Sequence, residues 1–141
     1  MSGAKPFLDT NIFLYGFDRG DARKAKIAQN LIDELLLAEN CVVSYQVVQE
    51  FVSVALKRFP AVMSDSELRA YLRAVFGRFE MVGSSLGLGE DALDLHNRYK
   101  LSWYDSLIVA AAMEAKCDVV YTEDLQHSQR FGDLVVTNSF L

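Results

Sequence analysis

The chain has 141 residues, of which 51% are hydrophobic and 23% are charged, with a formal net charge of −5. This length and composition are typical of one globular domain with a buried core and exclude a disordered or fibrous protein. The negative net charge argues against binding of nucleic acid through a uniformly basic surface. Local groups of basic residues, such as Lys57 with Arg58, can still attract a polyanion, although each group taken alone is more typical of a solvated helix face.

The longest apolar stretch, Leu107 to Met113, is far shorter than the roughly 20 residues that span a bilayer. The N-terminus lacks the basic and then apolar layout of a signal peptide. We therefore expect a cytoplasmic protein with no membrane segment. Cys41 and Cys117 have no CxxC spacing, so each is expected to be a buried, reduced thiol.

The first predicted strand is short and apolar, and it ends in an acid. It covers Phe7 to Asp9, and a tight turn with an apolar helical turn follows over residues 11–17. From Ala22 to about Ala38, apolar residues recur at steps of three and four, which predicts an amphipathic helix that Asp21 can cap.

A second strand is predicted at Cys41 to Val43, and Ser44 can cap the helix that follows it. In that helix Glu50 lies beside the buried stripe and not opposite it, because each residue advances by about 100° around the axis. Pro60 then breaks the helical pattern.

The second half of the chain continues the alternation of helices and strands. Helices are predicted after the capping box Ser64 to Glu67, from Leu88 to near Lys100, and from Ser102 to Cys117, with strands at 79–82, 118–122 and 134–136. The helix from Ser102 is apolar nearly all round and should be buried. Strands separated by helices predict an α/β fold with a mainly parallel sheet flanked by helices on both faces.

Acidic residues occur where these elements begin or end. The set of interest is Asp9, Glu50, Asp105 and Asp124. Sites in parallel sheets form at the carboxyl ends of the strands, which is where Asp9 and Asp124 fall. If the four carboxylates converge, their oxygen ligands favour Mg²⁺ or Mn²⁺, and such a site suits hydrolysis of phosphodiesters.

Each acid alone has a simpler interpretation. Asp105 fits a helix cap with Ser102, and Asp9 a turn residue. Glu50 alone would be a solvent-facing helix residue and Asp124 a loop acid. Glu123 is an alternative to its neighbour Asp124, and the residues themselves do not choose between the two.

Four ordered segments resemble the PIN domain family, and more specifically its VapC type of toxin ribonuclease. They are Phe7-Leu8-Asp9-Thr10-Asn11, Val48-Gln49-Glu50-Phe51, Tyr104-Asp105-Ser106-Leu107 with the apolar run after it, and Thr122-Glu123-Asp124-Leu125. The closing Asn138-Ser139-Phe140 is similar to the family's Asn-Pro-Phe ending, with Ser139 in place of proline. The resemblance covers residues 5–141 and leaves residues 1–4 as a short N-terminal extension.

The resemblance implies a single PIN-like domain with a five-stranded parallel sheet, and a Mg²⁺- or Mn²⁺-dependent endoribonuclease. It implies that Asp9 and Asp105 are the main metal ligands and that Glu50 and Asp124 complete the acidic set. Thr10, Asn11 and Thr122 would order this set through hydrogen bonds. The resemblance also implies a homodimer and a small VapB-like antitoxin partner.

Two other functions remain open alongside the toxin ribonuclease. A catalytically weak PIN-like module that binds RNA or protein is the main alternative, and the low basicity leaves room for it. A phosphatase with an aspartyl nucleophile ranks last, because Asn11 stands where a second acid would be expected. Four aromatic residues near the acids, Tyr15, Phe17, Tyr45 and Trp103, are expected to pack in the core rather than to stack on bases.

Overall fold

The computed structural model describes residues 4–58 and 63–141. The predicted helix break at Pro60 and most of the N-terminal extension lie outside the described residues. In chain order the elements are β1 (Pro6–Leu8), α1 (Thr10–Tyr15), α2 (Ala22–Ala38), β2 (Val42–Ser44), α3 (Tyr45–Arg58), α4 (Asp65–Ala74), the 3₁₀ helix η1 (Phe76–Arg78), β3 (Glu80–Val82), α5 (Leu86–Tyr99), α6 (Trp103–Glu114), β4 (Val119–Tyr121), β5 (Arg130–Phe131) and β6 (Leu134–Thr137).

The strands form one sheet in the order β3-β2-β1-β4-β6-β5. Every neighbouring pair is parallel except β5 with β6, which is antiparallel. The mainly parallel sheet is therefore confirmed, but the expected five strands are six. The additional strand, β5, has only two residues, which is too short for a hydrophobic period to reveal.

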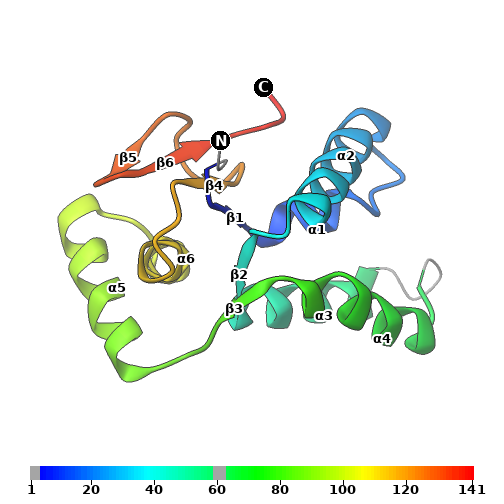
Figure 1. Cartoon of the computed structure of the whole chain (residues 1–141), viewed down its shortest axis with the longest axis horizontal. Helices are drawn as coiled ribbons and strands as arrows, with labels where there is room; N and C mark the ends of the chain where they lie inside the picture. The colour runs from blue at the N-terminus through cyan, green and yellow to red at the C-terminus, as the bar shows by residue number, and fades with distance from the viewer. Residues whose placement is uncertain (1–3, 59–62) are drawn as a thin grey trace.

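Helices cover both faces of the sheet, as predicted. Figure 1 shows α5 and α6 on one side of the strands and α1 to α4 on the other. The apolar helix α6 is central, and Val109, Ala111 and Ala112 are fully buried in it. In the described part of the chain, no helix is long and apolar enough to cross a membrane.

The predicted end of α6 at Cys117 is too late. The helix stops at Glu114, and Lys116 adopts a left-handed backbone with φ of 59°. This conformation turns the chain sharply, because a left-handed residue ends the helical hydrogen bonding. The turn allows the N–H of Asp118 to reach the carbonyl of Lys5 at 2.8 Å and aligns β4 with β1.

The register of β1 and β4 brings the ends of the two strands together. Leu8 pairs with Tyr121, and the N–H of Asp9 donates to the carbonyl of Tyr121 at 3.0 Å. The residues after these strands, Asp9 and Thr122, therefore leave the sheet side by side at its carboxyl edge. Both are buried there.

Candidate active site

All four predicted acids line one cavity of about 220 Å³ at the carboxyl edge of the sheet. Asp9 follows β1, Glu50 lies in α3, Asp105 lies in the first turn of α6, and Asp124 follows β4. We call this hollow the acid cavity. It is where the sequence analysis expected the carboxylates to converge.

Asp9 is the most buried of the four, with 4% of its surface exposed. It caps α1, because Oδ1 accepts from the backbone N–H of Thr10 at 2.7 Å, and its Oδ2 accepts from the hydroxyl of Thr122 at 2.8 Å. Burial raises the pKa of Asp9 to about 7; the two hydrogen bonds oppose this rise, and the charges of Asp124 and Glu50 add to it. The carboxylate is fixed in direction but is costly to ionise without a cation.

The packing of α1 against α3 places Glu50 in the acid cavity. The rings of Phe13 and Phe51 pack edge to face with centroids 6.4 Å apart and hold the two helices together. One turn before Phe13, the hydroxyl of Thr10 donates to Glu50 Oε1 at 2.7 Å. Glu50 is therefore held toward Asp9 and does not simply face solvent.

Asn11 connects the ends of β1 and β4. Its Nδ2 donates to Asp124 Oδ2 at 3.0 Å and to the hydroxyl oxygen of Thr122 at 3.3 Å. The backbone N–H of Asp124 also donates to Thr122 Oγ1 at 3.0 Å. These contacts hold the exposed Asp124 over the cavity. Asn11 Oδ1 is buried and has no hydrogen-bond partner among the described residues.

Asp105 lies at the start of α6, where Ser102 Oγ accepts from its backbone N–H at 3.2 Å. The predicted cap is thus present, and the carboxyl group of Asp105 also lines the acid cavity. Burial raises the pKa of Asp105, a hydrogen bond with Ser102 opposes the rise, and the charge of Asp124 adds to it. A structural cap and a site residue are therefore compatible at this position.

Glu123 points to a different set of partners. Its Oε2 pairs with Lys24 Nζ at 2.6 Å, and its Oε1 accepts from the hydroxyl of Tyr15. Burial raises the pKa of Glu123, but the hydrogen bonds from Lys24 and Tyr15 outweigh it and the net shift is downward. Glu123 does not line the acid cavity, so the geometry favours Asp124 as the fourth acid.

The donor set of the acid cavity fits a hard divalent cation. Its polar ligands are oxygens, no lysine or arginine lines it among the described residues, and Asn11 Oδ1 is an unused acceptor at its edge. In the described ranges, no three His, Cys, Asp or Glu side chains lie close enough together to hold an ion as they stand. Binding of an ion by this set would therefore require the half-buried Glu50 and Asp105 and the exposed Asp124 to move closer to Asp9.

Two further residues with polar groups in their side chains line the cavity, and the sequence analysis did not assign them to it. Gln46 lies one helical turn before Glu50, and Tyr104 directly precedes Asp105. The i, i+4 spacing of Gln46 and Glu50 in a predicted helix is the signal that could have found Gln46. Tyr104 stands just before the apolar run of a helix predicted to be buried. No pattern in the sequence therefore indicated that its side chain is exposed.

Comparison with known proteins agrees with this architecture. The model of the PIN domain matches residues 7–130. A toxin–antitoxin complex from Klebsiella pneumoniae has a chain with 19% identity and a TM-score of 0.68, over 92% of this chain and 95% of that one. VapBC2 from Rickettsia felis, bound to a promoter DNA fragment, has a chain with 18% identity and a TM-score of 0.64. The match covers 94% of this chain and 97% of that one.

A third similar structure is VapC20 from Mycobacterium tuberculosis, a toxin that cleaves the sarcin–ricin loop. It has 16% identity and a TM-score of 0.61, over 82% of this chain and 86% of that one. At these identities the three structures establish a common fold. No curated protein sequence matches the chain.

Proposed function

Because this chain belongs to the PIN domain family, we propose that it is a metal-dependent endoribonuclease and the toxin of a toxin–antitoxin pair. The observation that carries the proposal is the single cavity lined by Asp9, Glu50, Asp105 and Asp124. A cluster of carboxylates with no cationic side chain beside it is typical of a metal site for phosphodiester hydrolysis. The proposal assigns the activity to residues 5–141, with residues 1–4 as a short extension.

In this proposal Asp9 and Asp105 are the main ligands of Mg²⁺ or Mn²⁺, and Glu50 and Asp124 complete the set. When bound, such an ion neutralises charge at the scissile phosphate and acidifies the attacking water. The carboxylate of Asp9 must be ionised to bind it. Because the pKa of Asp9 is about 7, ionisation and ion binding are coupled near neutral pH.

Thr10, Asn11 and Thr122 are positioning residues in the proposal. Thr122 and the backbone of Thr10 direct the two oxygens of Asp9, while the hydroxyl of Thr10 directs Glu50. Asn11 directs Asp124. Metal ligands are usually oriented by such outer hydrogen bonds, and loss of one costs about 10- to 100-fold in affinity or activity.

The toxin role and its partners rest on the similar structures, which are a toxin–antitoxin complex, VapBC2 bound to promoter DNA and a toxin that cleaves the sarcin–ricin loop. We accordingly propose an RNA substrate, a VapB-like antitoxin and a homodimer. Induced expression of this chain should arrest growth, and expression of the small protein from an adjacent gene should relieve the arrest. Growth that continues at full rate despite folded, abundant protein would count against the toxin role.

The test of the nuclease is cleavage of total cellular RNA by purified, antitoxin-free protein with Mg²⁺, Mn²⁺ or EDTA. Wild type is compared with Asp9→Asn, which removes a charge but keeps the size of the side chain. Asp91→Asn is the matched control, because Asp91 is exposed on α5 and lies outside the acid cavity. We expect discrete fragments only with metal, and only from wild type and the control. Identical behaviour of all three proteins in every condition would favour the binding module instead.

A further inference from the structure

A second hollow lies beside the acid cavity and carries exposed aromatic side chains. It has a volume of about 760 Å³ and lies between the N-terminal ends of α3, α5 and α6. Trp103 and Tyr104 line it with 38% and 64% of their surfaces exposed, and Leu86 and Leu93 are 90% and 50% exposed. Core packing was the predicted role of Trp103, and its exposure shows that this prediction is wrong. We call this hollow the aromatic groove.

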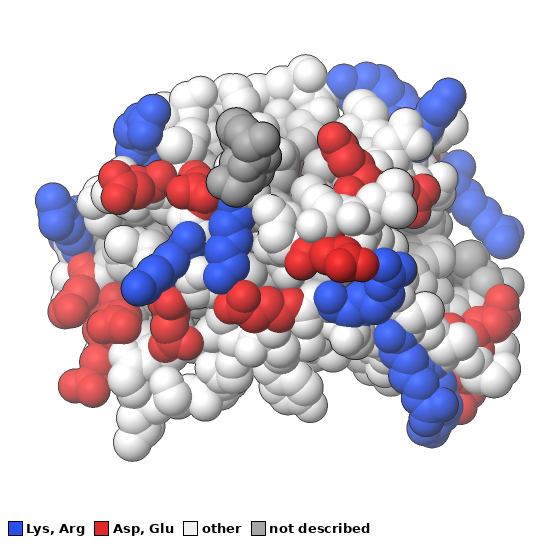
Figure 2. All heavy atoms as spheres, viewed as in Figure 1, with Lys and Arg blue, Asp and Glu red and all other residues white. Residues whose placement is uncertain are grey.

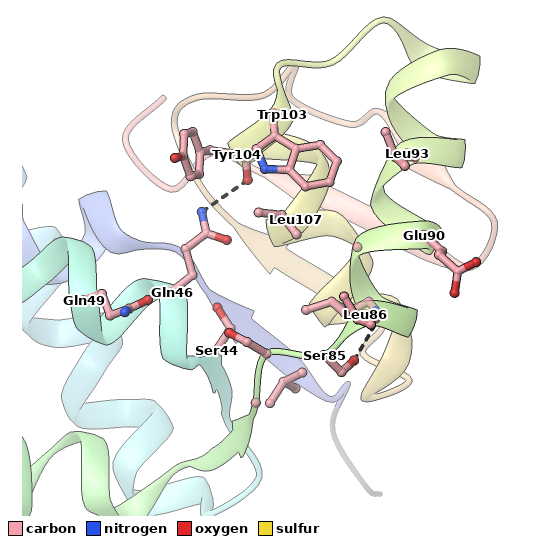
Figure 3. A pocket seen from close by; sticks show the side chains of 15 residues that line it. Ser44, Gln46, Gln49, Ser85, Leu86, Glu90, Leu93, Trp103, Tyr104 and Leu107 are labelled. Atoms are coloured by element: carbon pink, nitrogen blue, oxygen red, sulfur yellow. Dashed lines mark hydrogen bonds between the residues drawn. The ribbon is translucent and has the colours of Figure 1, made fainter.

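The aromatic groove adjoins the acid cavity. Gln46 and Tyr104 line both hollows, and Figure 3 shows the side-chain amide of Gln46 pointing to the backbone of Tyr104, with Gln46 Nε2 donating to the carbonyl of Tyr104 at 3.3 Å. A ligand in the aromatic groove can therefore be the neighbour of a phosphate in the acid cavity.

The chemistry of the groove suits a nucleobase. The rings and leucines offer a flat apolar surface, while the exposed Gln49 offers an amide group that can bond base edges. The groove is poorly suited to a phosphate, since Lys and Arg are absent from its described lining. Among the described residues that line it, Glu90 alone is charged, and its side chain points away from the other labelled residues in Figure 3.

A third hollow adjoins the acid cavity through other residues. It has a volume of about 330 Å³ and shares Asn11, Leu14 and Val54 with the acid cavity. Arg58 lines it, and we call it the arginine cavity. Asp18 also lines it, but Asp18 Oδ1 already accepts from the backbone N–H of Gly20 at 2.8 Å.

Arg58 is available to bind a phosphate. It is exposed at the end of α3, and its side chain makes no ion pair or hydrogen bond with any described residue. In the described lining of the three hollows it is the one basic side chain. Figure 2 shows acidic and basic side chains mixed over one face of the molecule, so this face offers no broad basic surface to a polyanion. Attraction of a phosphate to the site therefore depends on a single arginine beside it.

We propose that these three hollows form one substrate track, with a nucleobase bound by Trp103 and Tyr104 in the aromatic groove, the neighbouring phosphate in the acid cavity and a further phosphate bound by Arg58 in the arginine cavity. The inference rests on the proposed ribonuclease function and adds to it the residues that select and position the RNA. A base must be unpaired to enter the groove, because a paired base presents its face to its stacked neighbours. Trp103 and Tyr104 are thus specificity residues and Arg58 is a positioning residue.

Trp103 is the only tryptophan of the chain, so its fluorescence reports on the aromatic groove. The probe is a short unpaired oligoribonucleotide in EDTA, where no cleavage occurs, with an abasic ribose-phosphate strand of the same length as its control. We expect quenching by the first and not by the second. Tyr104→Ala should weaken binding by roughly 5- to 100-fold and Tyr104→Phe should restore it, because stacking requires the ring and not the hydroxyl. Tyr45→Ala is the matched control, since Tyr45 is 50% exposed but lies outside the groove.

The contribution of Arg58 is measured from the salt dependence of binding. Arg58→Gln should reduce the slope of log affinity against log salt by about 0.7, the value for one phosphate contact on a single strand. Lys57→Gln removes the same charge from the preceding residue of α3 but outside the three hollows, and should leave a steeper slope than Arg58→Gln.

The outcomes separate this inference from the nuclease proposal. Cleavage of RNA by wild type, with no quenching at saturating oligonucleotide and no effect of Tyr104→Ala, overturns the track and leaves the nuclease intact. Quenching without cleavage supports the track and counts against the nuclease. Trp103 fluorescence that changes on protein dilution and is insensitive to RNA would show that a second copy of the chain covers the groove, and would also overturn the inference.

Discussion

The carboxylates of Glu123 and Asp124 are adjacent in the sequence and face different partners. Glu123 pairs with Lys24 at 2.6 Å, whereas Asp124 accepts from Asn11 at 3.0 Å and lines the acid cavity. The two acids therefore have separable roles, one in holding α2 against the loop after β4 and one in the candidate site.

We predict that removal of the charge from Asp124 lowers mainly the activity, and that removal of the charge from Glu123 lowers mainly the stability. Asp124→Asn should lower metal-dependent RNA cleavage by about 10-fold or more, because it removes a charge from the proposed ligand set. Glu123→Gln should keep most of the activity and lower the free energy of unfolding by about 1 kcal/mol, since its ion pair with Lys24 is about one-quarter exposed. Cleavage rates and urea unfolding of the two variants check both effects. A larger loss of cleavage in Glu123→Gln would mean that the wrong acid has been assigned.

The pKa of Asp9 predicts how stability changes with pH in the metal-free protein. Burial is the main reason that this pKa is about 7 and not its ordinary 3.8. An acid with a raised pKa in the folded state binds its proton more tightly when folded, so its contribution is present at low pH and is lost as the pH rises through about 7. Relative to Asp9→Asn, the free energy of unfolding of wild type should fall by at most about 4 kcal/mol as the pH rises from 3.8 to about 7.

Urea unfolding in EDTA at several pH values, with Asp91→Asn as the control, checks this prediction. Addition of Mg²⁺ should stabilise wild type more above neutral pH than below it, because the ion binds the ionised carboxylate. Parallel pH curves for wild type and Asp9→Asn would show that Asp9 titrates normally.

Thr122→Val tests the hydrogen bond that directs Asp9. The hydroxyl of Thr122 is fully buried and donates to Asp9 Oδ2, and its oxygen accepts from the N–H of Asp124. Its removal should cost about 1–3 kcal/mol of stability and weaken metal binding by about 10- to 100-fold. Calorimetric titration with Mn²⁺ measures the second effect.

Thr137→Val is the control for that substitution. Thr137 is the last residue of β6 and pairs with Tyr121, and its backbone carbonyl accepts from the N–H of Thr122 at 3.1 Å. Equal loss of Mn²⁺ affinity in the two variants would attribute the effect to the sheet and not to the hydroxyl.

The two cysteines should be inert in the folded protein. Both are free and buried, and burial is the largest cause that raises the pKa of each to about 12. The thiolate is the reactive form, so neither should react with a disulfide reagent near neutral pH until the chain is unfolded in urea, when both should react. Rapid modification of the native protein would contradict the burial of Cys41 and Cys117.

Much of the fold follows from local patterns. The short apolar runs before Asp9 and Thr122 predict buried strands, and the apolar run of α6 predicts a central helix, because these patterns depend only on neighbouring residues. The family resemblance was likewise visible in the ordered acids, and the match over residues 7–130 confirms it. The two-residue strand β5 was missed, because its pairing with β6 depends on the turn between them and not on its own composition.

The sequence alone determined the main helices and strands other than β5, the sheet class and which acids stand at element ends. Only the tertiary structure showed that Glu123 pairs with Lys24 while Asp124 lines the acid cavity, and that Trp103 and Tyr45 are exposed while Tyr15 and Phe17 pack against the core. The physical reason is that a carboxylate's partner and a ring's exposure depend on contacts between residues far apart in the chain. Lys24 and Asn11 are 99 and 113 residues from the acids that they bind.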